Sequence, residues 1–342
     1  MAATIKDIAR RLNISTSTVS YALNGGPRTV PEEVKERVLS VARELGYRPN
    51  RIARSMVTRR TATYGVVPTE PAINLAISPF FQIVLNGILN AAEDFHRDVL
   101  IYTGYDHRDL KIYTDNLLDG RADGLIFIAP PLDTPIFPHI RRAGIPFVIT
   151  NSRAAEGAPN ITVNNRTGVV QALEHLLELG HRKIGFLYGK KVIDDGLERY
   201  EQFVEFFQRR GLPVREDWMF DGDFTQNGGE SCAGPIAALR DRPTAFFCAN
   251  DEMAVGLING LRHHGIRVPT DLSVVGFDDS TIAHLMQPQI TTVRQPLEEI
   301  GAAAVHALQA LIEGREAAPR QFSTRLVVRA SSERPLEDTK KS

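Results

Sequence analysis

Cysteine is almost absent from this sequence of 342 residues. Its two cysteines, Cys232 and Cys248, are too few for a disulfide framework and lack the spacing of a metal site. This usage is typical of proteins in a reducing compartment. No apolar run reaches the roughly eighteen residues of a membrane span, and the opening MAATIKDIAR lacks the apolar core of a signal peptide. We therefore expect a cytoplasmic protein.

Motifs that carry catalysis are also absent. The sequence contains no GxxxxGK[ST] phosphate loop, no GxGxxG dinucleotide motif, no GxSxG elbow and no HExxH zinc motif. The adjacent His263 and His264 fall where a helix is expected to end, and we interpret them as surface residues rather than metal ligands. We expect neither an enzyme nor a bound cofactor or metal.

The charges are unevenly distributed along the chain. The apolar fraction of 43% and the charged fraction of 24% are ordinary for a globular protein, and the length allows two or three domains. The net charge is −1, but residues 1–60 hold 12 Lys and Arg against 5 Asp and Glu. The basic first sixty residues fit phosphate binding that is localised to this part of the chain.

Two short helices joined by a tight turn are predicted in TIKDIARRLNISTSTVSYALN, residues 4–24. Thr4 and Asp7 match a capping-box start, Asn13 tolerates the left-handed backbone of a turn, and Ser15 can cap the second helix. The outward positions of that helix are polar: Thr16, Ser17, Ser20 and Tyr21. This pattern predicts a helix-turn-helix whose second helix fits a DNA major groove. Two small packed helices without DNA function are the alternative.

A third helix is predicted from Pro31 to Gly46, with apolar residues at helical spacing. The segments TIKDIA, STSTVSYALN, VPEEVKERV, LGYRPN and IARSM follow one another in order. Together they resemble the lac repressor (LacI/GalR) family of bacterial transcription regulators, and the resemblance continues nearly to the C-terminus. Several spaced motifs make this far more specific than a lone helix-turn-helix.

The segment NRIARSMVT, residues 50–58, is long enough for only one or two helical turns. The family resemblance implies a hinge helix that orders on operator DNA and wedges a Leu into the minor groove. Met56 stands at that place here, and an Arg-rich linker that contacts only phosphate is the alternative. The predicted DNA-binding residues are Thr4, Thr16, Ser17, Ser20, Tyr21, Asn24, Asn50, Arg51, Ala53, Arg54 and Met56.

Short apolar strands alternate with helices beyond the hinge. Strands are predicted at 64–67, 99–104, 124–130, 147–151, 183–189, 245–250, 272–278, 289–293 and 325–331. Helices are predicted at 81–95, 110–118, 169–179, 197–210, 236–239, 253–264 and 297–312. This alternation predicts two α/β subdomains with doubly wound parallel sheets. The resemblance implies the arrangement of periplasmic sugar-binding proteins, with the chain crossing between subdomains near 163, 292 and 322.

These segments suggest four parts of the chain. We expect a helix-turn-helix domain at 1–49, a hinge at 50–61, an effector-binding and dimerisation domain at 62–334 and a polar tail at 335–342. The N-subdomain would comprise about 62–162 and 293–321, and the C-subdomain about 163–292 and 322–334. The tail has no leucine heptads, so it does not indicate a tetramer-forming coiled coil.

Polar residues end several predicted strands, and ligands of paired α/β subdomains bind in the crevice at these ends. Matching residues to the family's effector pocket gives the candidates Phe80, Phe81, Asn151, Asp195, Arg199, Phe224, Asn250 and Asp278. Asn151 departs from the family's usual Asp. Core packing of Phe80 and Phe81, and helix capping by Asp278, are the alternative interpretations.

These observations predict a homodimeric transcription repressor that reads near-palindromic operator DNA under the control of a small-molecule effector. We expect a neutral sugar, because aromatic rings suit its C–H faces and several carboxylates against one guanidinium would repel an anion. A nucleobase is the alternative effector. A transport-type binding protein without DNA function, and an enzyme with a doubly wound core, are the alternative classes.

Overall fold

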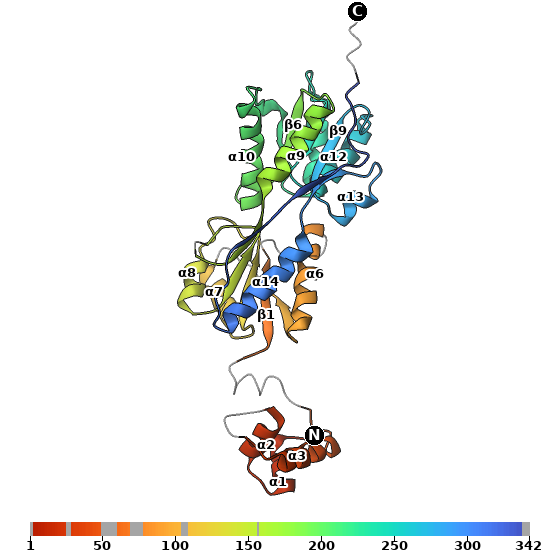
Figure 1. Cartoon of the computed structure of the whole chain (residues 1–342). Coiled ribbons are helices and arrows are strands. Elements are labelled where there is room, and N and C mark those ends of the chain that lie inside the picture. Colours follow the sequence, from red (N-terminus) through yellow and green to blue (C-terminus); the bar gives the residue numbers. More distant parts are fainter. Residues whose placement is uncertain are drawn as a thin grey trace, which may run out of the picture. The chain divides into compact units, whose positions relative to one another are not determined.

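The structure, a computed structural model, describes residues 3–24, 29–48, 60–68, 78–103, 109–155 and 157–336. The chain forms two compact units, residues 1–61 and residues 62–342 (Figure 1). In the described part of the chain, no helix is long and apolar enough to cross a membrane.

The first unit is a bundle of three helices. They are α1 (Ile5–Leu12), α2 (Thr16–Asn24) and α3 (Glu32–Glu44). Ile8, Val19 and Val38, one from each helix, are fully buried and form the centre of a small core. Asn13 ends α1 in the left-handed conformation with a φ of 54°, as its place in the sequence predicts.

The second unit contains two six-stranded sheets, one for each subdomain. The first sheet has the order β11 (Arg320–Phe322), β5 (Asn160–Val163), β4 (Phe147–Thr150), β3 (Gly124–Ile128), β1 (Thr63–Pro68) and β2 (Asp98–Ile101). All its strand pairs are parallel. Its central strand β3 is buried along its whole length, which explains its unbroken apolar sequence.

The second sheet has the order β12 (Arg325–Val327), β10 (Thr291–Arg294), β9 (Ser273–Asp278), β8 (Ala245–Cys248), β6 (Ile184–Tyr188) and β7 (Met219–Asp221). The strand β12 pairs antiparallel with β10, and the other pairs are parallel. The chain therefore passes from the first sheet to the second after Val163, returns after Arg294 and crosses again between Phe322 and Arg325.

Helices cover both faces of each sheet (Figure 1). The first sheet carries α6 (Pro79–Asp94), α7 (Leu110–Leu117), α8 (Phe137–Arg142) and α14 (Leu297–Ile312). The second carries α9 (Asn165–Glu178), α10 (Asp194–Arg209), α11 (Gln226–Ala237), α12 (Asp251–His263), α13 (Thr281–Leu285) and the 3-10 turn Glu216–Trp218.

Two helix pairs approach so closely that glycine is required at the contact. A Cβ added to Gly301 of α14 would lie 2.2 Å from the backbone oxygen of Val84 in α6. A Cβ on Gly256 of α12 would lie 1.9 Å from the oxygen of Gln226 in α11. At these two contacts the backbones of the paired helices pack directly against each other.

The helix predicted at residues 236–239 is wrong, because the helix at this place is α11, residues 226–237. Its sequence hides it: Gly228, Gly229 and Pro235 all lower helix propensity. Tertiary packing overrides that propensity, since Gly229 lets α11 approach the backbone of Met253.

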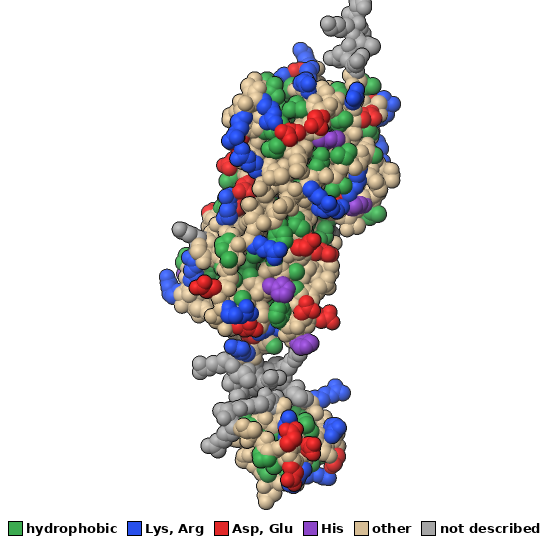
Figure 2. Space-filling view, in the orientation of Figure 1, with side chains coloured by type: hydrophobic (Ala, Val, Ile, Leu, Met, Phe, Trp, Pro, Cys, Tyr) green, Lys and Arg blue, Asp and Glu red, His purple; other side chains and the backbone are tan. Residues whose placement is uncertain are grey.

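On the coloured part of the second unit that Figure 2 shows, Lys and Arg side chains are interspersed with Asp and Glu. This face has no extended basic surface of the kind that a phosphate backbone attracts.

Candidate functional site

The second helix of the first unit presents a polar outer face. The Ser15 hydroxyl oxygen accepts a hydrogen bond from the Thr18 backbone N–H at 3.0 Å, which caps the start of α2. Beyond the cap, Thr16 and Ser17 are exposed, and Ser20 and Tyr21 are partly exposed. A helix face of this size, with hydroxyl groups and one longer phenol, suits base edges in a major groove.

Other predicted DNA-binding residues have different positions. The backbone N–H and the hydroxyl of Thr4 both donate to one Asp7 carboxylate oxygen, at 2.9 and 2.7 Å, so this hydroxyl serves the start of α1. The same bonds lower the pKa of Asp7 below its usual range. Asn24 is the last residue of α2. Asn50, Arg51, Ala53, Arg54 and Met56 lie outside the described residues.

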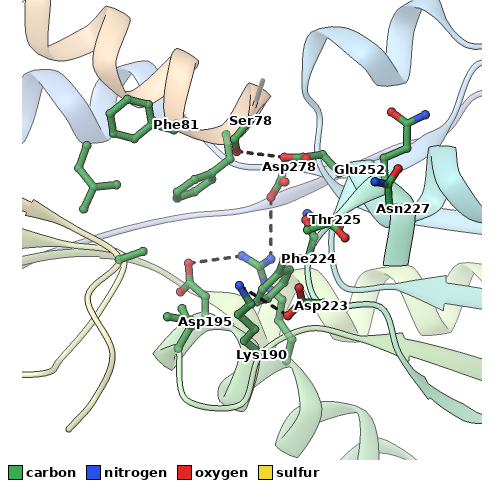
Figure 3. A pocket seen from close by; sticks show the side chains of 17 residues that line it. Ser78, Phe81, Lys190, Asp195, Asp223, Phe224, Thr225, Asn227, Glu252 and Asp278 are labelled. Atoms are coloured by element: carbon green, nitrogen blue, oxygen red, sulfur yellow. Dashed lines mark hydrogen bonds and ion pairs between the residues drawn. The ribbon is translucent and has the colours of Figure 1, made fainter. Parts of the chain in front are cut away.

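A cavity of about 360 Å³ lies in the second unit at the carboxyl ends of strands from both sheets (Figure 3). The N-subdomain contributes the start of α6 and the end of β3, and the C-subdomain contributes the segments that follow β6, β7, β8 and β9. Seven of the eight predicted effector residues line it: Phe80, Phe81, Asp195, Arg199, Phe224, Asn250 and Asp278. This is the place at which paired α/β subdomains bind ligands.

The backbone around the cavity is strained. Ala129, Asn151, Phe224 and Asp278, each following or ending a strand, have φ values of 46°, 55°, 58° and 122°. Non-glycine residues in this region cost of order 1–3 kcal/mol each, and they cluster at ligand sites. The strained backbone at these strand ends is therefore typical of a ligand-binding site.

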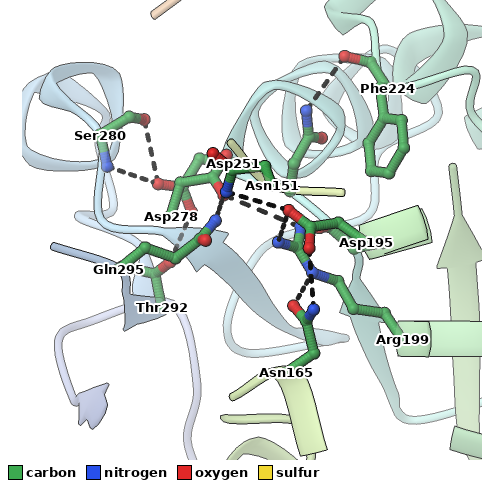
Figure 4. A network of polar contacts seen from close by, with 12 residues as sticks. Asn151, Asn165, Asp195, Arg199, Phe224, Asp251, Asp278, Ser280, Thr292 and Gln295 are labelled. Carbon is green, nitrogen blue, oxygen red and sulfur yellow. Dashed lines mark hydrogen bonds and ion pairs between the residues drawn. The ribbon is translucent and has the colours of Figure 1, made fainter. Parts of the chain in front are cut away.

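Arg199 is the centre of a buried polar network (Figure 4). Only 2% of it is exposed, and its guanidinium lies 3.8 Å above the ring of Phe277. It donates to the Asn165 side-chain oxygen at 2.9 Å and to the Ala249 backbone oxygen at 2.6 Å. These contacts hold the guanidinium in one orientation at the cavity wall.

Two buried carboxylates flank this guanidinium. Asp195 lies 3.5 Å from one Arg199 nitrogen, and Asp278 lies 3.8 Å from another. Burial raises the pKa of Asp195 and raises that of Asp278 well above its usual range, and the charge of Arg199 only partly offsets this. The Gln295 amide also donates to Asp278 at 2.6 Å. Burial thus favours the protonated carboxyls, and the contacts with Arg199 and Gln295 favour the ionised ones.

The Phe224 ring lies flat against the backbone of the C-subdomain. A Cβ on Gly189, the residue after β6, would lie 2.3 Å from this ring, so only glycine leaves room for it. Phe80 is partly buried, whereas Phe81 is 5% exposed and belongs to the core of the N-subdomain while also lining the cavity. Phe224 and Phe80 thus present the more available aromatic surfaces.

Two predicted effector residues use their side chains for hydrogen bonds to other parts of the protein. Asn151 does not line the cavity; it is fully buried, and its amide donates to Asp195 at 3.2 Å. Asn250 caps α12 by accepting from the Met253 N–H at 2.9 Å, and its amide donates to the Phe224 backbone oxygen at 3.0 Å. Asn250 therefore positions the cavity wall, while Asn151 joins the two subdomains.

The cavity also contains polar residues that the sequence did not identify as candidates. Ser78, Lys190, Asp223 and Glu252 line it. The Ser78 hydroxyl donates to Glu252 at 3.0 Å, which joins the start of α6 to the start of α12 across the cavity. Glu252 lies two residues after the predicted strand 245–250, so the strand-end rule that identified Asp278 could have found it. Asp223 follows β7, a strand that the sequence did not predict.

A third contact between the subdomains lies outside the cavity. The Arg153 guanidinium donates to the two Asp194 carboxylate oxygens at 2.9 and 2.8 Å and lies 2.8 Å from Glu198. The contact with Asp194 raises the pKa of Arg153. None of these three residues lines the cavity, so they hold the subdomains together without reaching a ligand there.

Known proteins resemble the chain along most of its length. Residues 4–50 match the family described as bacterial regulatory proteins, lacI family, and residues 173–332 match a periplasmic binding protein-like domain. The HTH-type transcriptional repressor PurR of Photobacterium profundum is 32% identical over 337 residues, covering 96% of this chain and 98% of that protein. The chain belongs to the LacI family.

Solved structures of LacI-family proteins confirm the fold. The lac repressor dimer bound to operator and the anti-inducer ONPF has a TM-score of 0.84 at 25% identity, covering 97% of this chain and 100% of that chain. The complex of the transcriptional regulator CelR with cellobiose has a TM-score of 0.73 at 29% identity, covering 96% and 99%. The resemblance and the fold class predicted from the sequence are thereby confirmed.

Family membership identifies the chain as a DNA-binding transcriptional repressor of the LacI type. The relatives that match it are transcription regulators rather than enzymes.

Proposed function

We propose that this repressor binds a near-palindromic operator as a homodimer, and that a sugar bound between its two subdomains controls its affinity for that operator. The observation that carries the proposal is the composition of the cavity. The phenyl groups of Phe80 and Phe224 face a space that Arg199 and Asp278 also line. Aromatic rings suit the C–H faces of a sugar, and the charged groups suit pairs of hydroxyls.

The charge of the cavity favours this ligand class over anions. Four carboxylates line the cavity, those of Asp195, Asp223, Glu252 and Asp278, together with the two cations Lys190 and Arg199. A phosphorylated or carboxylated ligand would meet net repulsion there. The CelR complex with cellobiose, a relative with a sugar ligand, supports the same class.

Control of DNA binding would follow from thermodynamic linkage. An effector shifts DNA affinity only by its differential affinity for two conformations of the repressor. The cavity is lined by both subdomains, so a ligand that contacts both favours one arrangement of them over others. Release of DNA and tighter DNA binding are both compatible with this mechanism.

Operator recognition is assigned to the outer face of α2. A homodimer with two-fold symmetry would place two copies of Thr16, Ser17 and Tyr21 on two half-sites of a near-palindrome. The lac repressor dimer bound to operator supports this arrangement. We also place the protein in the cytoplasm, where operator DNA is accessible and the free Cys232 and Cys248 stay reduced.

A gel shift on the DNA upstream of the protein's own gene, with calorimetry against sugars, sugar phosphates and purines, tests the proposal. We expect one or more sugars to bind and to change the shift. Tight purine binding without sugar binding would exclude the sugar effector in favour of a nucleobase, for which the flat Phe224 ring offers a stacking surface. Absence of any shift by the intact protein would exclude the proposed operator.

A further inference from the structure

Glu252 is a cavity carboxylate that faces no cation in the described part of the chain. The other three carboxylates of the cavity each have one: Asp195 and Asp278 lie 3.5 and 3.8 Å from Arg199, and Asp223 lies 3.5 Å from Lys190. Glu252 accepts one hydrogen bond, from the Ser78 hydroxyl at 3.0 Å (Figure 3). A carboxylate has about four lone-pair sites, so most of its acceptor capacity is unused.

The surroundings of Glu252 add further negative charge. The preceding residue, Asp251, is fully buried and accepts hydrogen bonds only from hydroxyl and backbone groups, those of Ser280 and Thr292. The start of α12 supplies about half of one positive charge, which both acidic residues must share. The cavity therefore keeps an excess of negative charge beside Glu252.

The titration of Glu252 reflects this imbalance. The pKa of Glu252 is raised to about 7. Burial is the largest cause, the hydrogen bond from Ser78 opposes it, and the charge of Asp251 adds to it. Asp278, from β9, also interacts electrostatically with Glu252. The ionised carboxylate is thus costly while no positive charge lies next to it, and a cationic group placed there would favour ionisation.

Resting on the proposed sugar effector, we propose that Glu252 binds a protonated amino group of the ligand, so that the effector is an amino sugar. An ammonium group supplies both the missing positive charge and hydrogen-bond donors for the unused lone pairs. The remaining hydroxyls of the sugar reach Arg199 and Asp278 in the same cavity. Glu252 is then the residue that selects among sugars.

A structural role of Glu252 predicts a different behaviour. The contact of Glu252 with Ser78 joins the subdomains. In a purely structural role, loss of this contact weakens the binding of every ligand equally. Arg153 provides the matched control, since its contacts with Asp194 and Glu198 also join the subdomains but lie outside the cavity. Glu252→Gln keeps the shape and an acceptor for Ser78, and removes only the charge.

The experiment is calorimetry at pH 6.5 with glucosamine, galactosamine and mannosamine, each against its parent hexose, on the intact wild-type protein, Glu252→Gln and Arg153→Ala. Gel shifts on the upstream DNA accompany each titration. In the wild type we expect an amino sugar to bind at least about tenfold more tightly than its parent, as expected for a charge-assisted hydrogen bond in a shielded site. Glu252→Gln should abolish that preference. Arg153→Ala should keep it, even where all affinities fall.

Each other outcome overturns the inference. Equal or tighter binding of every parent hexose, survival of the preference in Glu252→Gln, or its loss in Arg153→Ala would each refute the role of Glu252. If neutral hexoses bind and change the gel shift, the proposed function stands and only this inference fails. If no hexose or amino sugar binds, the sugar effector itself is refuted together with the inference.

Discussion

Replacement of Arg199 tests whether the polar network at the cavity wall depends on this one cation. Arg199→Met keeps the length and the packing on Phe277 but leaves Asp195 and Asp278 buried without their positive charge. Removing one partner of a buried ion pair costs about 3–5 kcal/mol of unfolding free energy. The triple variant that also carries Asp195→Asn and Asp278→Asn removes the carboxylate charges, and should recover most of that loss.

The loss should depend on pH in a defined direction. Burial raises the pKa of both carboxyls in the folded protein above the pKa in the unfolded chain. Their contribution to the free energy of unfolding is therefore present at low pH and is lost as the pH rises. Without Arg199 both values rise further. The difference in unfolding free energy between wild type and Arg199→Met should therefore be larger at pH 8 than at pH 6.

Urea unfolding without ligand measures this quantity. Trp218, the single tryptophan of the sequence, is 7% exposed and lies in the C-subdomain, so its fluorescence reports the subdomain that contains Arg199. A loss below about 1 kcal/mol for Arg199→Met would contradict the assigned role, since it is smaller than the cost of an unpaired buried charge. So would a loss independent of pH, or a triple variant as unstable as the single one.

Three further predictions concern the two units. Tyr21→Ala should change base preference at defined half-site positions, each lost contact costing about 1–3 kcal/mol; an unchanged preferred sequence in selection from random DNA would reject the assignment. Asp278→Ala should abolish the effector response in gel shifts and leave operator binding intact, because a hydroxyl loses its acceptor at a cost of about 1–3 kcal/mol; a normal response would remove Asp278 from the site. Gly301→Ala should destabilise by about 1–3 kcal/mol or more through overlap with Val84. In calorimetric unfolding, Gly234→Ala is its control, since that Cβ would meet only His264 at 3.5 Å, and equal effects of the two would contradict the close helix contact.

The helix-turn-helix could be predicted almost residue by residue because local chemistry determines it. Ser15 caps α2, Asn13 adopts the left-handed turn with a φ of 54°, and Gly46 follows α3 with a φ of 62°. Each of these residues acts through its own backbone or through the next turn of helix. Such short-range signals are visible in a single sequence.

Elements that depend on distant partners were harder to predict. The strand β5 is only four residues long and β11 only three, and two of the three residues of β11 are exposed, so each is too short to give a distinct periodic signal. They pair with each other, Arg320 opposite Ile161, although well over a hundred residues separate them. Neither strand was predicted, because their pairing within the first sheet joins segments that are distant along the chain.

In the cavity, too, some residues could be predicted from the sequence and others depend on distant partners. Asp278 was identified because it ends a predicted strand and Arg199 because it matches the family's effector pocket, and both line the cavity. The ends of the predicted strands pointed to Asn250, which caps α12, but not to Glu252, which lines the cavity two residues further along the chain. The role of Glu252 depends on Ser78, which approaches it from the other subdomain.

The helix α6, which packs closely against α14, connects the cavity with the start of the second unit. This helix of 16 residues, about 24 Å long at 1.5 Å per residue, begins at Pro79, and its second residue, Phe80, lies on the cavity wall. Just beyond its far end, Arg97 contacts Asp123 at 2.6 Å, and Asp123 also accepts from the backbone N–H of Ala62, the first residue of the second unit. Since the Gly301 contact holds α6 closely against α14, a tilt of α6 at the cavity would shift the residues through which this unit connects to residues 1–61.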